Sequence, residues 1–294
     1  MDDPLEEIVG RLDQAKLLVL GDIALERVLR GEAVEAGPGV LRLRAPEQTT
    51  RVGAAGGIAA AAAAVGAQVW AAGILGQDPQ SGEVLRALAG AGVDPFGMVT
   101  AAGARTGESM VVEFDAAGPW SRVEIELAPP PPLEGPPAQE MLQHIEPLIA
   151  RADALVMVSP RAAAPETLAR AAEFARGRGK LVIGALGDSP LPPGDVVVQG
   201  PADDAPAATP EALIAVRDDG SVQVLGGRVE TASFAAALDR GDPRAWEQFI
   251  AGVAAAAAIG AEPLAAARIG AAAAAAGSRA PITADAIRRQ LSAG

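Results

Sequence analysis

The sequence predicts an α/β fold, in which a mostly parallel sheet is covered by helices on both faces, and two observations lead to it. Short apolar runs alternate with longer segments of helical composition along most of the 294 residues. Half of the residues are apolar, which is enough for a substantial core. Strands and helices in alternation favour parallel strands, because each helix returns the chain to the end of the sheet where the previous strand began.

The elements follow from these patterns in order. Buried strands are expected where apolar residues run together, at 16–22, 68–76, 154–159, 180–186 and 195–200. Helices are expected from length and composition, at 57–65, 79–91, 138–151, 165–176, 243–260, 262–277 and 283–292. The apolar stretch 53–76 is long enough to cross a bilayer. It is mostly Ala and Gly, which insert weakly, so we expect a buried helix followed by a strand.

Two insertions, at about 28–52 and 106–127, interrupt the alternation. The first contains the strand-like run VLRLRA, and in the second MVVEFD and SRVEIEL flank a Gly118-Pro119 turn. Both predict antiparallel strands that stand outside the parallel core, so together they predict a small sheet at one edge. An exposed sheet of this kind needs a cover from a ligand or a second subunit. The proline-rich run 129–137 is expected to be a stiff surface linker.

Composition narrows the classes of partner. The formal charge is -13 and basic residues form no dense cluster, so nucleic acid and anionic membranes are poor partners. Cysteine is absent, which excludes disulfides, thiolate metal sites and a Cys nucleophile. The acidic N-terminal residues do not resemble a secretion signal, so we expect a cytoplasmic protein. His144, the single histidine, is expected at a surface or half-buried position on a helix without a catalytic role, because no nucleophile motif accompanies it.

Three motifs carry a family resemblance: GDIALER at 21–27, RVGAAGGIA at 51–59 and VGAQV at 65–69. In this order they resemble the ribokinase (PfkB) carbohydrate kinase family, and within it the kinase domain of bifunctional ADP-heptose synthase, whose pattern is GDxxLDR, RPGGAANVA and LGA. The resemblance covers nearly the whole chain. It implies one ribokinase-like domain over 1–294, a three-layer α/β/α sandwich with a small β-sheet lid, and a homodimer formed through that lid.

The resemblance also implies a reaction, the transfer of the γ-phosphoryl group of ATP to a sugar hydroxyl with magnesium present. Such kinases use an anion hole at a helix N-terminus, with an Asp in the first turn as the base, in the motif GAGD. Unpaired N–H groups and the helix dipole favour the transferring phosphoryl charge there. The carboxylate takes the hydroxyl proton.

In this chain GAGD falls on Arg244-Ala245-Trp246-Glu247, so the base position holds Glu247 and both glycines are replaced. The side chain of Trp246 would obstruct the close approach of a phosphate. Losing one such hydrogen-bond donor costs about 2.7 to 4 kcal/mol in known oxyanion holes. Asp242 is an alternative base, because Arg240-Gly241-Asp242 also ends in Gly-Asp. We favour Asp242-Pro243 as the cap of a helix that begins a turn earlier than in the family.

Other positions that the resemblance assigns are also altered. The substrate-side residues correspond to Asp22, Glu26, Gly53 and Gly57, and two family Asn residues are replaced by Gly57 and Ala61. In the nucleotide region Asp204 alone could hold a metal through water, and Gly220 is the counterpart of a loop glycine. We therefore predict a pseudokinase with a binding, regulatory or structural role. The alternative is an active but atypical heptose-like kinase that uses Glu247 or Asp242 as base, with ATP and magnesium.

Overall fold

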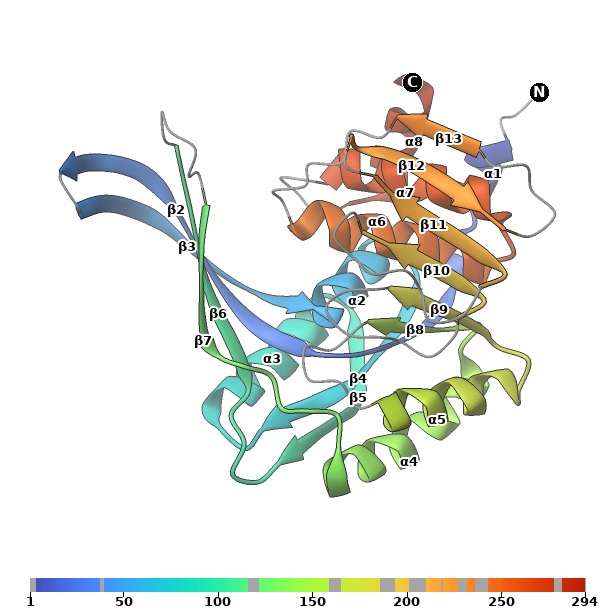
Figure 1. The fold of residues 1–294 in the computed structure, drawn as a ribbon, viewed down its shortest axis with the longest axis horizontal. Coiled ribbons are helices and arrows are strands. Elements are labelled where there is room, and N and C mark those ends of the chain that lie inside the picture. Colours follow the sequence, from blue (N-terminus) through green and yellow to red (C-terminus); the bar gives the residue numbers. More distant parts are fainter. Residues whose placement is uncertain are drawn as a thin grey trace.

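The protein forms two β-sheets with helices packed on both faces of the larger one (Figure 1). The computed structural model describes residues 4–37, 40–115, 122–158, 165–185, 194–200, 210–217, 219–226, 232–235, 243–277 and 282–293. The predicted α/β class is confirmed. The predicted turn at Gly118-Pro119 lies outside the described residues.

The larger sheet has nine strands in the order β13-β12-β11-β10-β9-β8-β1-β4-β5. The strands from β5 to β11 are parallel, and β12 and β13 are added antiparallel at one edge. The bounds are β1 Lys16–Leu20, β4 Gln68–Gly76, β5 Val93–Ala101, β8 Ala154–Val158, β9 Leu181–Ala185, β10 Val196–Gln199, β11 Ala212–Val216, β12 Ser221–Leu225 and β13 Ala232–Ala235. The central strands read as unbroken apolar runs because both of their faces are buried.

Successive residues of β1 point into two separate cores. Leu17 and Val19 pack with α2, α6 and α7, and Leu18 and Leu20 pack with α4 and α5 on the other face. The helix bounds are α1 Pro4–Val9, α2 Ala55–Ala64, α3 Pro79–Gly90, α4 Gly135–Arg151, α5 Pro165–Arg176, α6 Pro243–Ala258, α7 Pro263–Gly277 and α8 Ala284–Ala293. Because α4 begins at Gly135, it takes up the end of the predicted linker.

The smaller sheet, called the lid sheet below, has four strands in the order β3-β2-β6-β7 and curves away from the larger one (Figure 1). The strands are β2 Ile23–Gly37, β3 Val40–Ala54, β6 Gly107–Asp115 and β7 Arg122–Ala128. Each predicted insertion forms an antiparallel hairpin, but the two hairpins join through the parallel pair β2 and β6. The expectation of a wholly antiparallel small sheet is therefore wrong at that junction, because both insertions leave the main sheet in the same direction.

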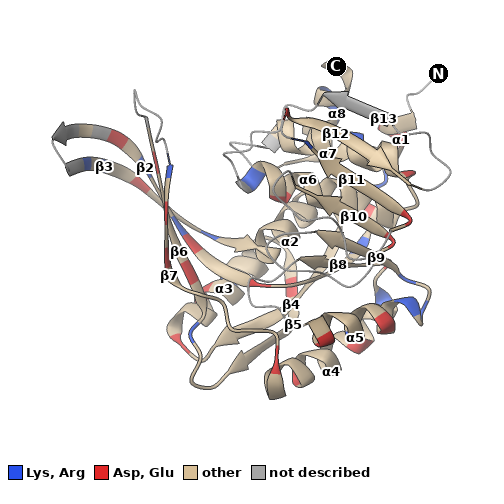
Figure 2. Cartoon of the chain, in the orientation of Figure 1, with Lys and Arg blue, Asp and Glu red and all other residues tan. Residues whose placement is uncertain are grey.

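Acidic and basic positions both occur along the lid strands (Figure 2), and several of their side chains form ion pairs. Glu113 of β6 accepts from Arg30 of β2 at 2.7 Å and from Arg122 of β7 at 3.1 Å. Arg27 contacts Glu108 at 2.7 Å. These pairs tie three strands together in a sheet that has little core of its own.

The start of α3 is tied to the start of β6 by one carboxylate. Asp78 caps the helix by accepting a hydrogen bond from the Ser81 N–H at 3.1 Å, with Pro79 at the first helical position. The Thr106 N–H and hydroxyl also donate to Asp78, at 2.8 and 2.6 Å. Burial alone would raise the pKa of Asp78, but these hydrogen bonds and the charge of Arg105 together hold that pKa below its ordinary value.

His144 is half-buried on α4, with its ring centroid 5.8 Å from that of Phe96.

In the parts of the chain that the structure describes, no helix has both the length and the apolar character needed to span a membrane.

Candidate functional site

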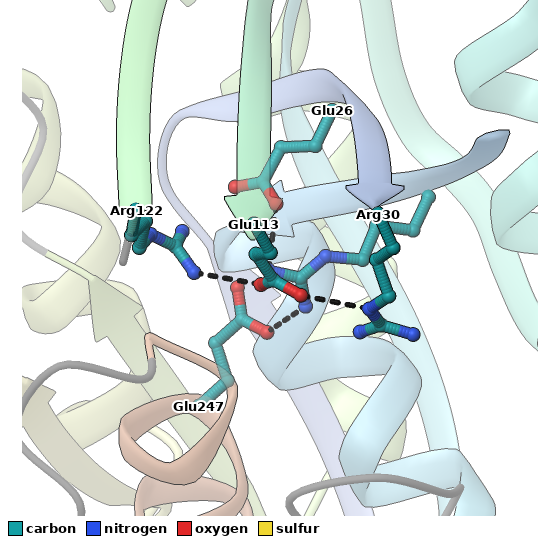
Figure 3. Close-up of polar contacts among 6 residues, drawn as sticks. Glu26, Arg30, Glu113, Arg122 and Glu247 are labelled. Carbon is teal, nitrogen blue, oxygen red and sulfur yellow. Dashed lines mark hydrogen bonds and ion pairs between the residues drawn. The ribbon is translucent and has the colours of Figure 1, made fainter. Parts of the chain in front are cut away.

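Two buried glutamates and a half-buried arginine form a cluster where the lid sheet meets α6 (Figure 3). Arg51 Nη1 donates to Glu247 Oε2 at 2.9 Å, and Arg51 Nη2 lies 2.6 Å from Glu26 Oε2. Arg51 and Glu26 stand opposite each other on β3 and β2, so the strand register sets this pair. Glu247 reaches the cluster from the second turn of α6. We call these three residues the carboxylate cluster.

Two glycines leave room for the two glutamates. A Cβ on Gly53 would lie 2.1 Å from Glu26 Oε1, and a Cβ on Gly57 would lie 2.2 Å from Glu247 Cδ. Real Cβ atoms do not approach other atoms this closely, so neither glycine can gain a side chain while the glutamates stay in place. The cluster thus depends on small residues at 53 and 57 as well as on its charges.

The electrostatics of the cluster are set by burial and by an excess of negative charge. Burial raises the pKa of Glu247 to about 7, Arg51 opposes this rise, and the neighbouring Glu26 adds to it. Burial lowers the pKa of Arg51, but Glu247 and Glu26 outweigh burial and hold that pKa above its ordinary value. Arg51 therefore stays charged, and Glu247 exchanges its proton near neutral pH.

The beginning of α6 differs from a phosphate-binding turn. The helix begins at Pro243, as the sequence predicts, so Glu247 is its fifth residue and lies past the first turn. Trp246 stacks on Phe249 with ring centroids 5.7 Å apart and an interplanar angle of 11°. Because the positive end of a helix dipole acts within the first turn, Glu247 lies beyond the region that best stabilises an anion. Asp242, the alternative base, lies outside the described residues.

The start of α2 holds a backbone conformation that alanine rarely adopts. Ala54, which precedes the helix, has φ 53° and ψ -126°. The family pattern RPGGAANVA has Gly at this position, which suits such a conformation. This chain keeps the turn without the glycine, so strain is expected at this position.

The structure brings together four of the residues singled out from the sequence: Glu26, Gly53, Gly57 and Glu247. Asp22 is only 7% exposed and follows β1, where its backbone oxygen accepts a hydrogen bond from the Ala55 N–H. Gly220 lies apart, with φ 79° in the turn between β11 and β12. Asp204 lies outside the described residues.

Sequence reasoning gave no role to Arg51, the residue at the centre of the cluster. It stands at the head of the motif RVGAAGGIA, whose family counterpart also begins with Arg. A sequence signal was present, because Arg51 directly precedes the apolar run VGAAGGIA, and a charged residue beside a buried segment needs a partner of opposite charge.

A pocket of about 460 Å³ opens beside the carboxylate cluster. Small side chains of α2 and α3 form one wall, and β3 and α6 supply the polar end. The wall of small side chains includes Ala60, Ala61 and Ala87, and the polar end includes Arg51, Arg244 and Glu247. The described ranges contain no group of three His, Asp or Glu side chains that could hold a metal ion.

Comparisons with known proteins agree with this architecture. The family model of the pfkB family carbohydrate kinases matches residues 14–192. The bifunctional protein HldE of Trichlorobacter lovleyi is 30% identical over 162 residues, which are 53% of this chain and 31% of that protein. The chain thus spans less than a third of the length of this relative.

Solved structures show the same fold. A microbiome-derived acarbose kinase, Mak1, superposes with a TM-score of 0.75 at 17% identity, over 95% of this chain and 99% of the other. The ribokinase of Arabidopsis thaliana, solved with ribose and ATP, superposes with a TM-score of 0.68 at 17% identity, over 95% and 98%. Because the family model matches residues 14–192, more than half of the chain, the chain belongs to the pfkB family of carbohydrate kinases.

Proposed function

We propose that this chain is a pfkB-family homologue that has lost efficient phosphoryl transfer and acts as a pseudokinase, with a binding, regulatory or structural role. The observation that carries the proposal is the state of the base position. Glu247 is 7% exposed, and its carboxylate is held by Arg51 at 2.9 Å. The positive charge of Arg51 stabilises the ionised form of Glu247, which makes the carboxylate a weaker base towards a hydroxyl proton.

The rest of the turn supports the same proposal. Arg244 and Trp246 replace the two glycines of GAGD, and the aromatic ring of Trp246 lies against Phe249. The backbone N–H groups of a phosphate-binding turn must approach the ligand closely, and side chains at these positions obstruct that approach. Several losses at one site are not additive, but they act in the same direction.

One observation favours the second candidate function, an active atypical sugar kinase. A pKa of about 7 suits a general base that works at neutral pH. In that reaction Glu247 would take the proton of a sugar hydroxyl, the hydroxyl oxygen would bond to the γ-phosphorus of ATP, and ADP would leave. The γ-phosphoryl group would then need stabilisation from a turn that has lost its glycines.

Ligand binding and turnover separate the two candidates. Thermal unfolding with and without magnesium ATP tests nucleotide binding, because a ligand at a hundred times its dissociation constant adds about 2.7 kcal/mol of stability. ADP release is then measured with a panel of sugars and sugar phosphates. The pseudokinase proposal predicts no sugar-stimulated ADP release, with or without a thermal shift. Sugar-stimulated release that is lost in Glu247→Gln and kept in the control Glu113→Gln would establish the active kinase.

We also propose a homodimer formed through the lid sheet. Val123, Ile125 and Leu127 are exposed at alternate positions of the edge strand β7, so they line one side of it. Exposed apolar side chains on an edge strand favour contact with another protein chain.

Light scattering should give a dimer for the wild type and a monomer for Ile125→Glu. Phe96→Glu, at an exposed position on β5 outside the lid sheet, is the control and should remain dimeric. A monomeric wild type would contradict the homodimer.

A further inference from the structure

We propose that the carboxylate cluster is a proton-controlled latch, which holds the lid sheet against α6 when Glu247 is protonated and loosens when Glu247 is ionised. The proposal does not require the chain to be inactive, because it concerns the position of the lid sheet and not phosphoryl transfer.

The connection itself is clear from the geometry. Arg51 belongs to the lid strand β3, and Glu247 belongs to α6, 196 positions later in the sequence. Their hydrogen bond of 2.9 Å therefore joins the lid sheet to a helix of the main body. The lid strands also pack Leu25 and Val52 into the core of the main body. A second ion pair to the main body, Arg27 with Glu83 of α3, is 3.4 Å long and more exposed. Exposed pairs contribute little, so we expect Arg51 and Glu247 to matter more.

The charges around Glu247 are few. Arg51 faces it from β3, Glu26 from β2 and Arg244 from its own helix. The neighbouring helix α2 has no titratable side chain, and α7 contributes only the exposed Arg268. Burial and the charges of Arg51, Glu26 and Arg244 thus set the pKa of Glu247.

The charge balance makes the cluster sensitive to a single proton. With both glutamates ionised, Arg51 faces two negative charges in a buried place, and the cluster carries one uncompensated charge. Protonation of Glu247 leaves one carboxylate for one guanidinium, and the neutral carboxyl group can still accept the hydrogen bond from Arg51. An uncompensated charge is costly to bury, so the neutral arrangement suits the closed lid.

The direction of the pH effect follows from linkage. In the closed lid the pKa of Glu247 is about 7, whereas an ordinary exposed glutamate has 4.5. Opening the latch returns Glu247 to water, where its pKa takes the ordinary value. The closed form therefore binds the proton more tightly than the open form. Acid therefore favours the closed lid, and a rise in pH through 7 favours opening. The two pKa values together predict that the open fraction increases about tenfold between pH 6 and pH 8.

Opening would change access to the neighbouring pocket. Arg51 and Glu247 both line that pocket, at the end where β3 meets α6. Movement of β3 away from α6 would divide the polar end of the pocket, because Arg51 belongs to β3 and Glu247 belongs to α6. The latch thus links the proton concentration to the shape of the pocket.

Hydrogen exchange with mass spectrometry tests the latch in the full chain. Exchange is followed in peptides covering 47–54 and 243–250 at pH 6 and pH 8, after correction for the intrinsic effect of pH on amide exchange. We expect corrected exchange in both peptides to be about tenfold faster at pH 8 in the wild type. Glu247→Gln removes the titrating group and keeps the size of the side chain, so its corrected exchange should not depend on pH.

Glu113→Gln is the matched control, because Glu113 also pairs with arginines but does so within the lid sheet. It should keep the tenfold pH effect. The proposal is overturned if wild-type exchange is the same at both pH values, if Glu247→Gln keeps the pH effect, or if Glu113→Gln loses it. Should Glu247→Gln fail to fold, the wild-type comparison decides alone. Loss or retention of ADP release in the same proteins addresses the pseudokinase proposal separately.

Discussion

The carboxylate of Glu247 occupies the space above Gly57, where a Cβ would lie 2.2 Å from Glu247 Cδ. In the family pattern the first position holds Asp and the second Asn. Here the acidic side chain is longer by one methylene, and the residue beneath it has no side chain. The two changes compensate sterically, and together they allow a buried Glu to reach Arg51.

Gly57→Ala tests this steric relationship. Alanine is normally favoured over glycine inside a helix by about 1 kcal/mol, but here the added methyl group must displace Glu247. We expect a net loss of about 1 to 3 kcal/mol in unfolding free energy, measured by urea denaturation. Gly90→Ala in α3 is the control, because a Cβ there meets nothing within 4 Å. If the two variants are equally stable, the contact between Gly57 and Glu247 does not constrain the fold.

The titration of Glu247 should contribute to the change of unfolding free energy with pH. Its pKa rises from 4.5 to about 7 on folding, so the folded state binds the proton more tightly. The contribution of this group is therefore greatest below pH 4.5 and falls as the pH rises to 7, by about 3 kcal/mol in all. Unfolding free energies at pH 5 and pH 7.5 should differ less in Glu247→Gln than in the wild type. Equal differences in the two proteins would refute the burial of an ionisable Glu247.

Arg51→Met removes the guanidinium that contacts both Glu26 and Glu247. At pH 7.5 two buried carboxylates remain without it, and breaking a buried pair in this way costs about 3 to 5 kcal/mol. The loss should be smaller at pH 5, where Glu247 is protonated. Arg44→Met is the control, because the pair of Arg44 with Glu32 is exposed and should contribute at most about 1 kcal/mol. Similar losses in the two variants would show that the cluster is not specially important.

Ala54→Gly should stabilise the protein. Ala54 has φ 53° and ψ -126°, a conformation that costs residues other than glycine about 1 to 3 kcal/mol. Relief of this strain is partly offset by the greater entropy of glycine in the unfolded chain. We expect a net gain of about 1 kcal/mol in thermal or chemical unfolding. A loss of stability would mean that the strain is absent.

The fold was predictable where the sequence pattern reflects burial directly. The strands β1, β4 and β8 are buried on both faces, so their apolar runs identify them. Strand β5 was missed because Pro95 and Gly97 interrupt it and its side chains alternate in burial. The short helix α1 has six residues, too few for a clear helical period.

The candidate site was predictable only in part. The motifs identified Glu26, Gly57 and Glu247 one by one, because each stands at a position with a family counterpart. Their joint contact with Arg51 depends on the register of β2 with β3 and on where α6 meets the lid sheet. No local pattern encodes a contact between residues 196 positions apart. The pKa of Glu247 likewise depends on burial, which only the folded chain defines.

The measurement that most directly tests the loss of phosphoryl transfer is ³¹P NMR of ATP with stoichiometric wild-type protein, magnesium and a mixture of sugars and sugar phosphates. Stoichiometric protein makes even a single slow turnover visible. We predict that the ATP signals stay as they are in a sample without protein. Growth of ADP together with a new phosphate ester in the wild type, but not in Glu247→Gln, would contradict the pseudokinase proposal and identify Glu247 as the base.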